Sequence, residues 1–168
     1  MSLRTILFGR LLASQIRQPR GFLGGLVGRG MARQNKESND WTISLLNVQP
    51  DDHVLEVGFG PGLAIKSVSQ MAAKGFVAGI DFSRAMVQQA SKLNASEIKG
   101  GRVELRNADV SSIPYDDDSF DKVFAVNVIY LWPYLPSVVN ELKRVMKSGS
   151  ILALYAAPLE LVDKMGLS

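Results

Sequence analysis

The residues best suited to chemistry begin with a glycine-rich turn that follows a short apolar run. Residues 54–57 have the pattern of a buried strand, and Gly58-Phe59-Gly60-Pro61-Gly62 follows at once. Closely spaced glycines permit a tight turn and let a ligand lie against bare backbone. The G-x-G-x-G spacing differs from the G-x-G-x-x-G of dinucleotide sites, because Leu63 stands where the third glycine would be. Glu56, just before the turn, can organise the loop or meet a cationic ligand.

Two further carboxylates follow the next two predicted strands. Asp81 closes the apolar run 76–81, where a carboxylate can accept both hydroxyls of a ribose. Phe82 and Met86 either form an apolar slot for an adenine face or fill the core. Asp109 can accept a hydrogen bond from the adenine amine, although an isolated loop aspartate is usually solvated or caps a turn.

Alternating strands and helices must position these residues. Strands are predicted at 54–57, 76–81, 102–106, 122–126 and 150–156, and helices at 41–46 (capped by Asn39 or Asp40), 63–73, 83–93 and 135–146. This alternation predicts an α/β fold with a doubly wound parallel sheet covered by helices on both faces. The binding crevice is then expected at the carboxyl ends of the strands.

The composition excludes several other chemistries. The chain has no cysteine, and therefore no disulfide, thiolate nucleophile or zinc–thiolate site. Its single histidine, His53, is expected in a solvated turn, and we predict no metal site. No apolar stretch reaches the roughly 18 to 20 residues of a membrane-spanning helix. The lack of cysteine agrees with a cytoplasmic protein, which is the default expectation.

Charge divides the chain into two predicted regions. Residues 1–36 contain seven of the 19 Lys and Arg residues and none of the 16 Asp and Glu, which leaves residues 37–168 with 12 basic and 16 acidic side chains. The basic segment 1–36 is amphipathic and contains a glycine-rich hinge at 21–30. Three interpretations stay open: a lid packed on the main domain, a helix on a membrane surface or acidic partner, and a cleavable organellar presequence.

Taken together, the motifs resemble those of the class I S-adenosylmethionine (SAM)-dependent methyltransferases, over about residues 40–156. The matching segments are, in order, Glu56 with Gly58, Gly60 and Gly62; Asp81 to Met86, similar to D-x-S-x-x-M; Asn107 to Val110; Ile113 to Asp121, similar to I-P-x-x-D-x-S-F-D; and Glu141 to Ser150, similar to the helix and turn before the fifth strand. The resemblance implies a Rossmann-like fold, SAM as cofactor, and methyl transfer by in-line displacement.

The resemblance also implies roles for individual residues. Glu56 and the Gly58, Phe59, Gly60 and Gly62 turn would hold the methionine end of the cofactor, Asp81 the ribose, and Phe82, Met86, Asp109 and Val110 the adenine. Asn127, at the end of the fourth strand, would face the transfer site, with its backbone on the cofactor's amino group. Tyr130 and Trp132 are candidates for the acceptor pocket or are structural, and no residue stands out as a general base.

A small molecule or lipid is the expected acceptor. Residues 127–130 lack both prolines of the D/N-P-P-Y/F motif of adenine methylases, and the 5-methylcytosine mechanism needs a cysteine. We expect no nucleic-acid partner, because residues 37–168 are acidic and contain no base-reading element.

The length of the chain adds one more expectation. Members of the family continue past the fifth strand with two more, for which residues 159–168 are too few. We therefore expect five strands without strands six and seven, in either a fragment or a natural short form, with an apolar edge at 151–155 that favours a homodimer. A non-catalytic module that binds SAM or acts as a scaffold is the main alternative. A nicotinamide-dependent oxidoreductase is disfavoured by the glycine spacing.

Overall fold

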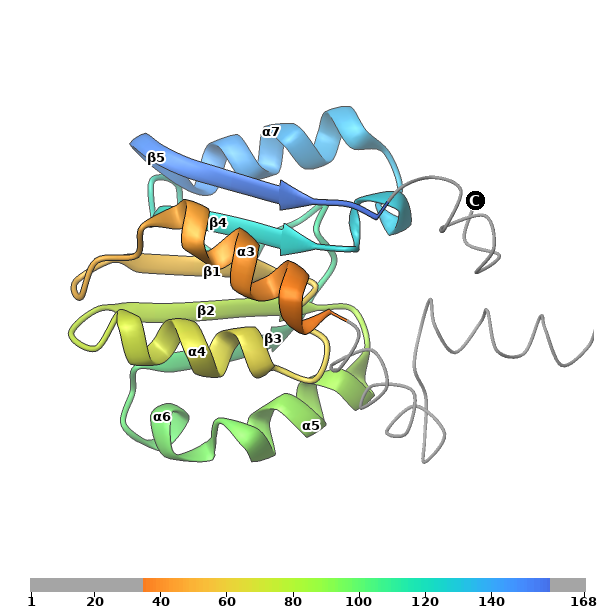
Figure 1. Cartoon of the computed structure of the whole chain (residues 1–168). Helices are drawn as coiled ribbons and strands as arrows, with labels where there is room; N and C mark the ends of the chain where they lie inside the picture. Colours follow the sequence, from red (N-terminus) through yellow and green to blue (C-terminus); the bar gives the residue numbers. More distant parts are fainter. Residues whose placement is uncertain (1–34, 158–168) are drawn as a thin grey trace, which may run out of the picture.

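The computed structural model describes residues 35–157, which form one five-stranded sheet with its helices (Figure 1). In chain order the elements are α3 (Lys36–Leu46), β1 (His53–Val57), α4 (Leu63–Met71), β2 (Phe76–Asp81), α5 (Arg84–Leu93), α6 (Ala95–Lys99), β3 (Val103–Asn107), β4 (Phe120–Val126), the 3-10 helix η1 (Ile129–Leu131), α7 (Leu135–Val145) and β5 (Met146–Tyr155). Apart from Asn35 and Lys36, the predicted basic arm lies outside the described residues, as does the segment 158–168.

The strand order is β3-β2-β1-β4-β5, and all four pairs are parallel. The chain therefore builds outward from β1 to β3 and then returns to the other side of β1. In an open sheet, this reversal leaves a crevice beyond the carboxyl ends of the two strands where it occurs, here β1 and β4. The predicted doubly wound α/β fold is confirmed.

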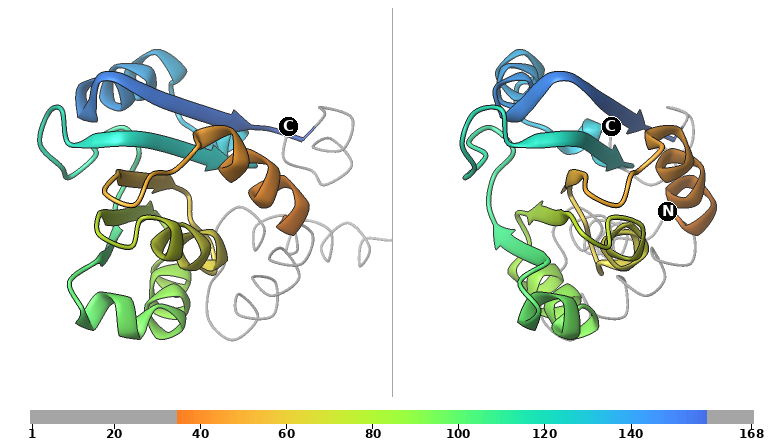
Figure 2. Two further views of the ribbon diagram at one scale, coloured as in Figure 1. Left: turned by 60° about the vertical axis from the view of Figure 1, so that its left-hand side comes forward. Right: turned by 90° about the vertical axis from the view of Figure 1, so that its left-hand side faces the viewer.

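Helices and a loop cover the two faces of the sheet. Val54 of β1 packs into a cluster with Ile43 of α3 and Ile65 of α4, whereas its neighbour Leu55 packs on the opposite face with Leu142 of α7. Figure 2 shows α3 and α7 on opposite sides of β4 and β5. Because β1 has core on both faces, Val54, Leu55 and Val57 are apolar on both sides of the strand, and Glu56 is the one charged residue among them.

Some boundaries differ from the predicted ones. Helix α3 begins at Lys36 with Asn35 as its N-cap residue, not at Asn39 or Asp40, since Asn39 N already donates to Asn35 O at 2.8 Å. His53 is the first residue of β1 instead of a turn residue, and its N donates to Asp121 Oδ2 at 2.8 Å. The short helices α6 and η1 were not predicted.

The strand β5 begins at Met146, directly after α7, and a register shift against β4 follows. It forms one edge of the sheet in residues 35–157, and Ile151, Leu152 and Leu154 are exposed there. Within the same residues, no helix is both long and apolar enough to span a membrane.

Candidate cofactor site

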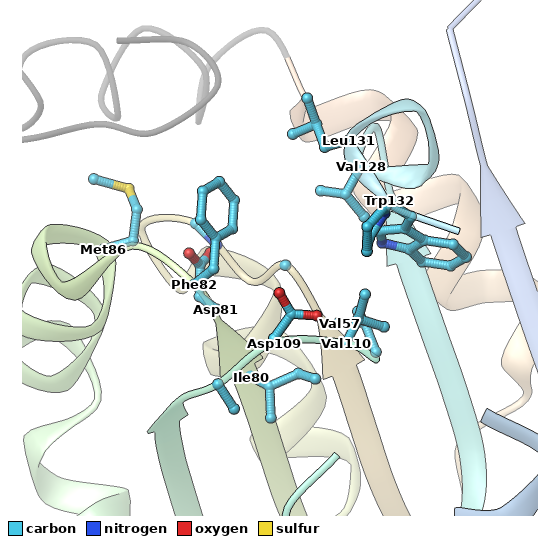
Figure 3. A pocket seen from close by; sticks show the side chains of 14 residues that line it. Val57, Ile80, Asp81, Phe82, Met86, Asp109, Val110, Val128, Leu131 and Trp132 are labelled. Carbon is cyan, nitrogen blue, oxygen red and sulfur yellow. The ribbon is translucent and has the colours of Figure 1, made fainter. Parts of the chain in front are cut away.

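A cavity of about 200 Å³ lies at the carboxyl ends of β1, β2 and β4 (Figure 3). It is mainly apolar, and its walls come from the glycine turn, the ends of the strands and the loops that follow them. The lining residues are Val57, Gly58, Gly60, Ile80, Asp81, Phe82, Met86, Ala108, Asp109, Val110, Val128, Leu131, Trp132 and Pro133. The cavity thus occupies the crevice that the strand order predicts.

The glycine turn needs its glycines for two physical reasons. Gly58, Gly60 and Gly62 all have positive φ angles, of 77°, 52° and 82°, which other residues rarely adopt. A Cβ on Gly58 would lie 2.6 Å from Val128 Cγ1, and a Cβ on Gly62 would lie 2.5 Å from Ala90 Cβ. A Cβ on Gly60 would meet nothing within 4 Å. Gly58 and Gly60 line the cavity, while Gly62 is the N-cap residue of α4 and packs against α5.

Phe59 anchors this turn to the sheet. Its side chain is buried in the core, and a Cβ added to Gly79 of β2 would lie 2.6 Å from Phe59 Cδ1. The missing side chain at Gly79 therefore makes room for the phenyl ring. Phe59 is outside the cavity wall, so its predicted contribution to cofactor binding would come from its backbone.

Asp81 joins the glycine turn to the turn that begins α5. Its Oδ2 accepts a hydrogen bond from Gly60 N at 2.9 Å, and its Oδ1 accepts one from Ser83 N at 2.8 Å. Burial raises the pKa of Asp81, and the two N–H donors oppose that shift. Each carboxylate oxygen can accept a second hydrogen bond. The side chain can therefore hold the two turns and still bind a pair of hydroxyls.

Glu56 precedes the glycine turn in β1 and is not among the residues that line the cavity. It is fully buried, and its Oε2 has no hydrogen-bond partner among the described residues. Burial raises the pKa of Glu56 to about 8, and the negative charge of Asp81 adds to the shift. A buried acid without a partner for one oxygen is costly unless a donor or a cation approaches it.

The adenine-side candidates line one side of the cavity. Met86 is 2% exposed, and Phe82 stands at the rim with 42% of its surface exposed. Figure 3 places Asp81, Phe82 and Asp109 between Met86 on one side and Trp132 on the other. Asp109 Oδ1 accepts hydrogen bonds from Ser111 Oγ at 2.6 Å and Ser111 N at 2.8 Å, which lower the pKa of Asp109.

The three acceptor-pocket candidates are placed differently from one another. Trp132 lines the cavity, whereas Tyr130, in η1, is half-buried outside the lining, and its burial raises its pKa. Asn127 directs its side chain away, to Asn35 and Ala157, and it is outside the lining as well.

Sequence reasoning missed several residues that shape the site. Val128, Leu131 and Pro133 complete the apolar wall, and only their position after the fourth strand could have pointed to them. Asn94 is fully buried at the end of α5, and its Nδ2 donates to Gly62 O at 3.1 Å and Ala90 O at 2.9 Å. No local pattern marks this asparagine as a support of the glycine turn.

Comparison with known proteins identifies the family. The sequence profile described as "Methyltransferase domain" matches residues 55–154. The uncharacterized methyltransferase YdaC of Bacillus subtilis is 32% identical over 135 residues, which make up 80% of this chain and 72% of that protein. The sterol methyltransferase-like protein 3 of Botryococcus braunii is 30% identical over 70% of this chain and 30% of its own length.

Among solved structures, a SAM-dependent methyltransferase from Aquifex aeolicus is 26% identical with a TM-score of 0.63, over 69% of this chain and 62% of that one. This chain therefore covers less than two thirds of the length of that structure and of the Botryococcus relative. The profile, the curated relatives and the solved structure point to one family. The chain belongs to the methyltransferase domain family, as a class I SAM-dependent methyltransferase with the Rossmann-like fold.

Proposed function

We propose that this chain binds SAM in the cavity between Met86 and Trp132 and directs methyl transfer to a small-molecule or lipid acceptor. Bound SAM supplies a methyl group on a positively charged sulfur, which makes that methyl electrophilic. The protein's task is then to orient both reactants and exclude water. The observation that carries the proposal is the 2.9 Å hydrogen bond from Gly60 N to Asp81 Oδ2, which joins the glycine turn to the acid at the cavity wall.

The donor set fits such a cofactor. The glycine turn presents backbone without side chains, and the unpartnered Oε2 of buried Glu56 is available for a hydrogen bond near that turn. Asp81 retains capacity to accept the ribose hydroxyls. Phe82, Met86, Asp109 and Val110 supply apolar surface and one acceptor for adenine.

An apolar wall supports the choice of acceptor. Val128, Leu131 and Trp132 face the cavity across from Met86, and they present no charged side chain (Figure 3). The Botryococcus relative is named for sterols, which are lipids. We extend this class of acceptor, and no particular molecule, to the present chain.

Calorimetric titration with SAM and its demethylated product, S-adenosylhomocysteine, tests the proposal, with NADH as the ligand control. We expect micromolar binding of both, no response to NADH, and at least a tenfold loss of affinity in Asp81→Ala. Asp121→Ala is the matched protein control, because Asp121 also accepts a backbone N–H, from His53 at 2.8 Å, but at the amino end of the sheet. Absence of SAM binding by folded protein, or equal losses in the two variants, would contradict the proposal.

An assay of S-adenosylhomocysteine formation, run beside the titration, separates catalysis from the non-catalytic alternative. A binding module would take up SAM and yet produce no S-adenosylhomocysteine with any acceptor offered, including sterols and acyl lipids.

Four features stay predictions from the sequence. They are the division of the chain at residue 36, the membrane or partner role of the arm, the homodimer through β5 and the cytoplasmic location.

A further inference from the structure

An arginine on α7 holds the loop that follows β3. Arg144 Nε and Nη2 donate to the two carboxylate oxygens of Glu141, one turn earlier, each at 2.9 Å. The same guanidinium donates through Nη2 to Ile113 O at 2.8 Å, and through Nη1 to Tyr115 O at 2.8 Å and Asp117 Oδ1 at 2.9 Å. One planar group therefore binds three points of the loop at once.

Glu141 completes the attachment. Its Oε2 accepts a hydrogen bond from Ile113 N at 2.9 Å, so both backbone groups of Ile113 are bonded to the pair. Ile113 is buried in the cluster on the α7 face of the sheet, together with Val110 and Leu142. Ile113 is thus held both by apolar packing and by hydrogen bonds to the charged pair Arg144 and Glu141.

The loop contains no regular secondary structure. No helix or strand occurs between Asn107, where β3 ends, and Phe120, where β4 begins. The backbone groups of a loop must find partners elsewhere, and here Arg144 and Glu141 supply several of them. Arg106 adds a contact from the other side, because its guanidinium lies 4.4 Å from the centre of the Tyr115 ring.

The loop is continuous with the adenine side of the cavity. Ala108, Asp109 and Val110 line that cavity, and Ser112 N donates to Asp109 O at 3.1 Å. Only two residues separate Val110 from Ile113, where Arg144 and Glu141 bind. Ile113 and the cavity wall therefore belong to one short, hydrogen-bonded stretch of chain.

We propose that Arg144 and Glu141 are positioning residues for the adenine side of the cofactor site, acting through the loop 108–117. This inference rests on the proposed function, because it needs a cofactor whose adenine lies beside Asp109 and Val110. Neither residue lines the cavity, so the effect on binding is indirect.

The test compares Arg144→Met, Arg144→Lys and Glu141→Gln with Lys147→Met. Lys147 is the matched control, because it also forms an ion pair near the end of α7, with Asp121 at 2.9 Å, but contacts no part of the loop. For each variant, we would measure unfolding in urea, the affinity for S-adenosylhomocysteine and adenosine at 10 °C, and hydrogen exchange at the Ile113 amide.

We expect Arg144→Met to bind both ligands at least tenfold more weakly, Arg144→Lys and Glu141→Gln to show smaller losses, and Lys147→Met to stay within twofold of the wild type. The Ile113 amide should exchange faster in the Arg144 and Glu141 variants alone, and S-adenosylhomocysteine should slow it again. A purely structural role would lower stability and speed exchange at the Ile113 amide, but it would leave the affinity for both ligands unchanged. If Arg144→Met does not fold, the two milder variants carry the comparison.

The two proposals fail in different ways. If the wild type binds neither S-adenosylhomocysteine nor adenosine, the proposed function fails and this inference falls with it. If the wild type binds and all the Arg144 and Glu141 variants keep wild-type affinity, only the positioning role is overturned.

Discussion

Asn127 and Asn35 are 92 residues apart in the sequence, yet Asn127 Nδ2 donates to Asn35 Oδ1 at 2.9 Å. Asn127 Oδ1 accepts a second hydrogen bond, from Ala157 N, also at 2.9 Å. The residue has a left-handed backbone, with φ of 57°, at the end of β4. One amide therefore ties the start of α3 to the residues that follow β5, next to the cavity.

Removal of this amide should cost measurable stability. Asn127→Gly retains the backbone conformation and loses both side-chain bonds, so we expect the free energy of unfolding to fall by about 1 to 3 kcal/mol. Asn47→Gly is the control, because Asn47 is also left-handed, with φ of 46°, and its side chain is exposed. Equal losses in the two variants, measured by urea denaturation, would refute the role of the Asn127 side chain.

Gly62 and Gly60 should respond differently to alanine. Both have positive φ, so each substitution strains the backbone by roughly 1 to 2 kcal/mol. Gly62→Ala also drives a Cβ to within 2.5 Å of Ala90 Cβ, and overpacking adds about 1 to 3 kcal/mol. Gly60→Ala meets no atom within 4 Å, but its methyl group lies at the cavity wall. Gly62→Ala should therefore lose more stability in denaturation, while Gly60→Ala should weaken SAM binding. The reverse order of stabilities would contradict the geometry.

The protonation of Glu56 should make stability depend on pH. Its pKa is about 8 in the folded protein and near the ordinary value of 4.5 when unfolded. The folded state therefore binds the extra proton between these values, and the free energy of unfolding should fall as the pH rises from about 4.5 to about 8. Glu56→Gln should flatten this slope. A smaller dependence of stability on pH should remain in the variant, because the pKa of Asp81 is also raised. An unchanged slope in Glu56→Gln, by urea denaturation at several pH values, would rule out Glu56 as its source.

Asn94→Asp tests the support of the glycine turn. The change replaces an NH₂ group that binds Gly62 O and Ala90 O with a carboxylate, which repels both carbonyls in a fully buried position. We expect a loss of about 3 kcal/mol or more at pH 7, partly recovered at pH 5 as the acid gains a proton. Asn107→Asp is the control, because Asn107 Nδ2 also donates to a carbonyl, Asp81 O at 2.8 Å, but Asn107 is exposed. That variant should lose no more than about 1 kcal/mol, and a loss as large as that of Asn94→Asp would contradict the prediction.

The sequence predicted those features that depend on local pattern. The mainly apolar runs at 54–57 and 76–81 match β1 and β2 closely, since strands buried on both faces carry apolar residues at adjacent positions and not only at alternate ones. The sequence also indicated the glycine turn and Asp81. The turn needs glycine for its backbone geometry, and Asp81 stands at the end of a predicted strand. The short helix η1 was missed, since three residues carry no periodic signal.

Contacts between distant residues could not be predicted in this way. Two sets of hydrogen bonds depend on how elements far apart in the chain pack together: those from Arg144 to the loop 113–117, and the one from Asn94 to Gly62. Asn127 was expected to face the transfer site, but its side-chain direction follows from partners at Asn35 and Ala157. The side-chain hydrogen bonds that support the site therefore depend on tertiary packing. The strands and the glycine turn that form the site can be predicted from local sequence.

The strand order also affects how the protein is made. During synthesis, β1, β2 and β3 leave the ribosome first and can associate, but β1 must wait for β4, which begins 63 residues after β1 ends. Until then, the apolar β1 is an unpaired edge that can associate with other nascent chains. Because every strand pair is parallel and closes over a long intervening segment, no hairpin can form quickly to protect it. The strand at the centre of the finished sheet thus has an open edge while the chain is being made.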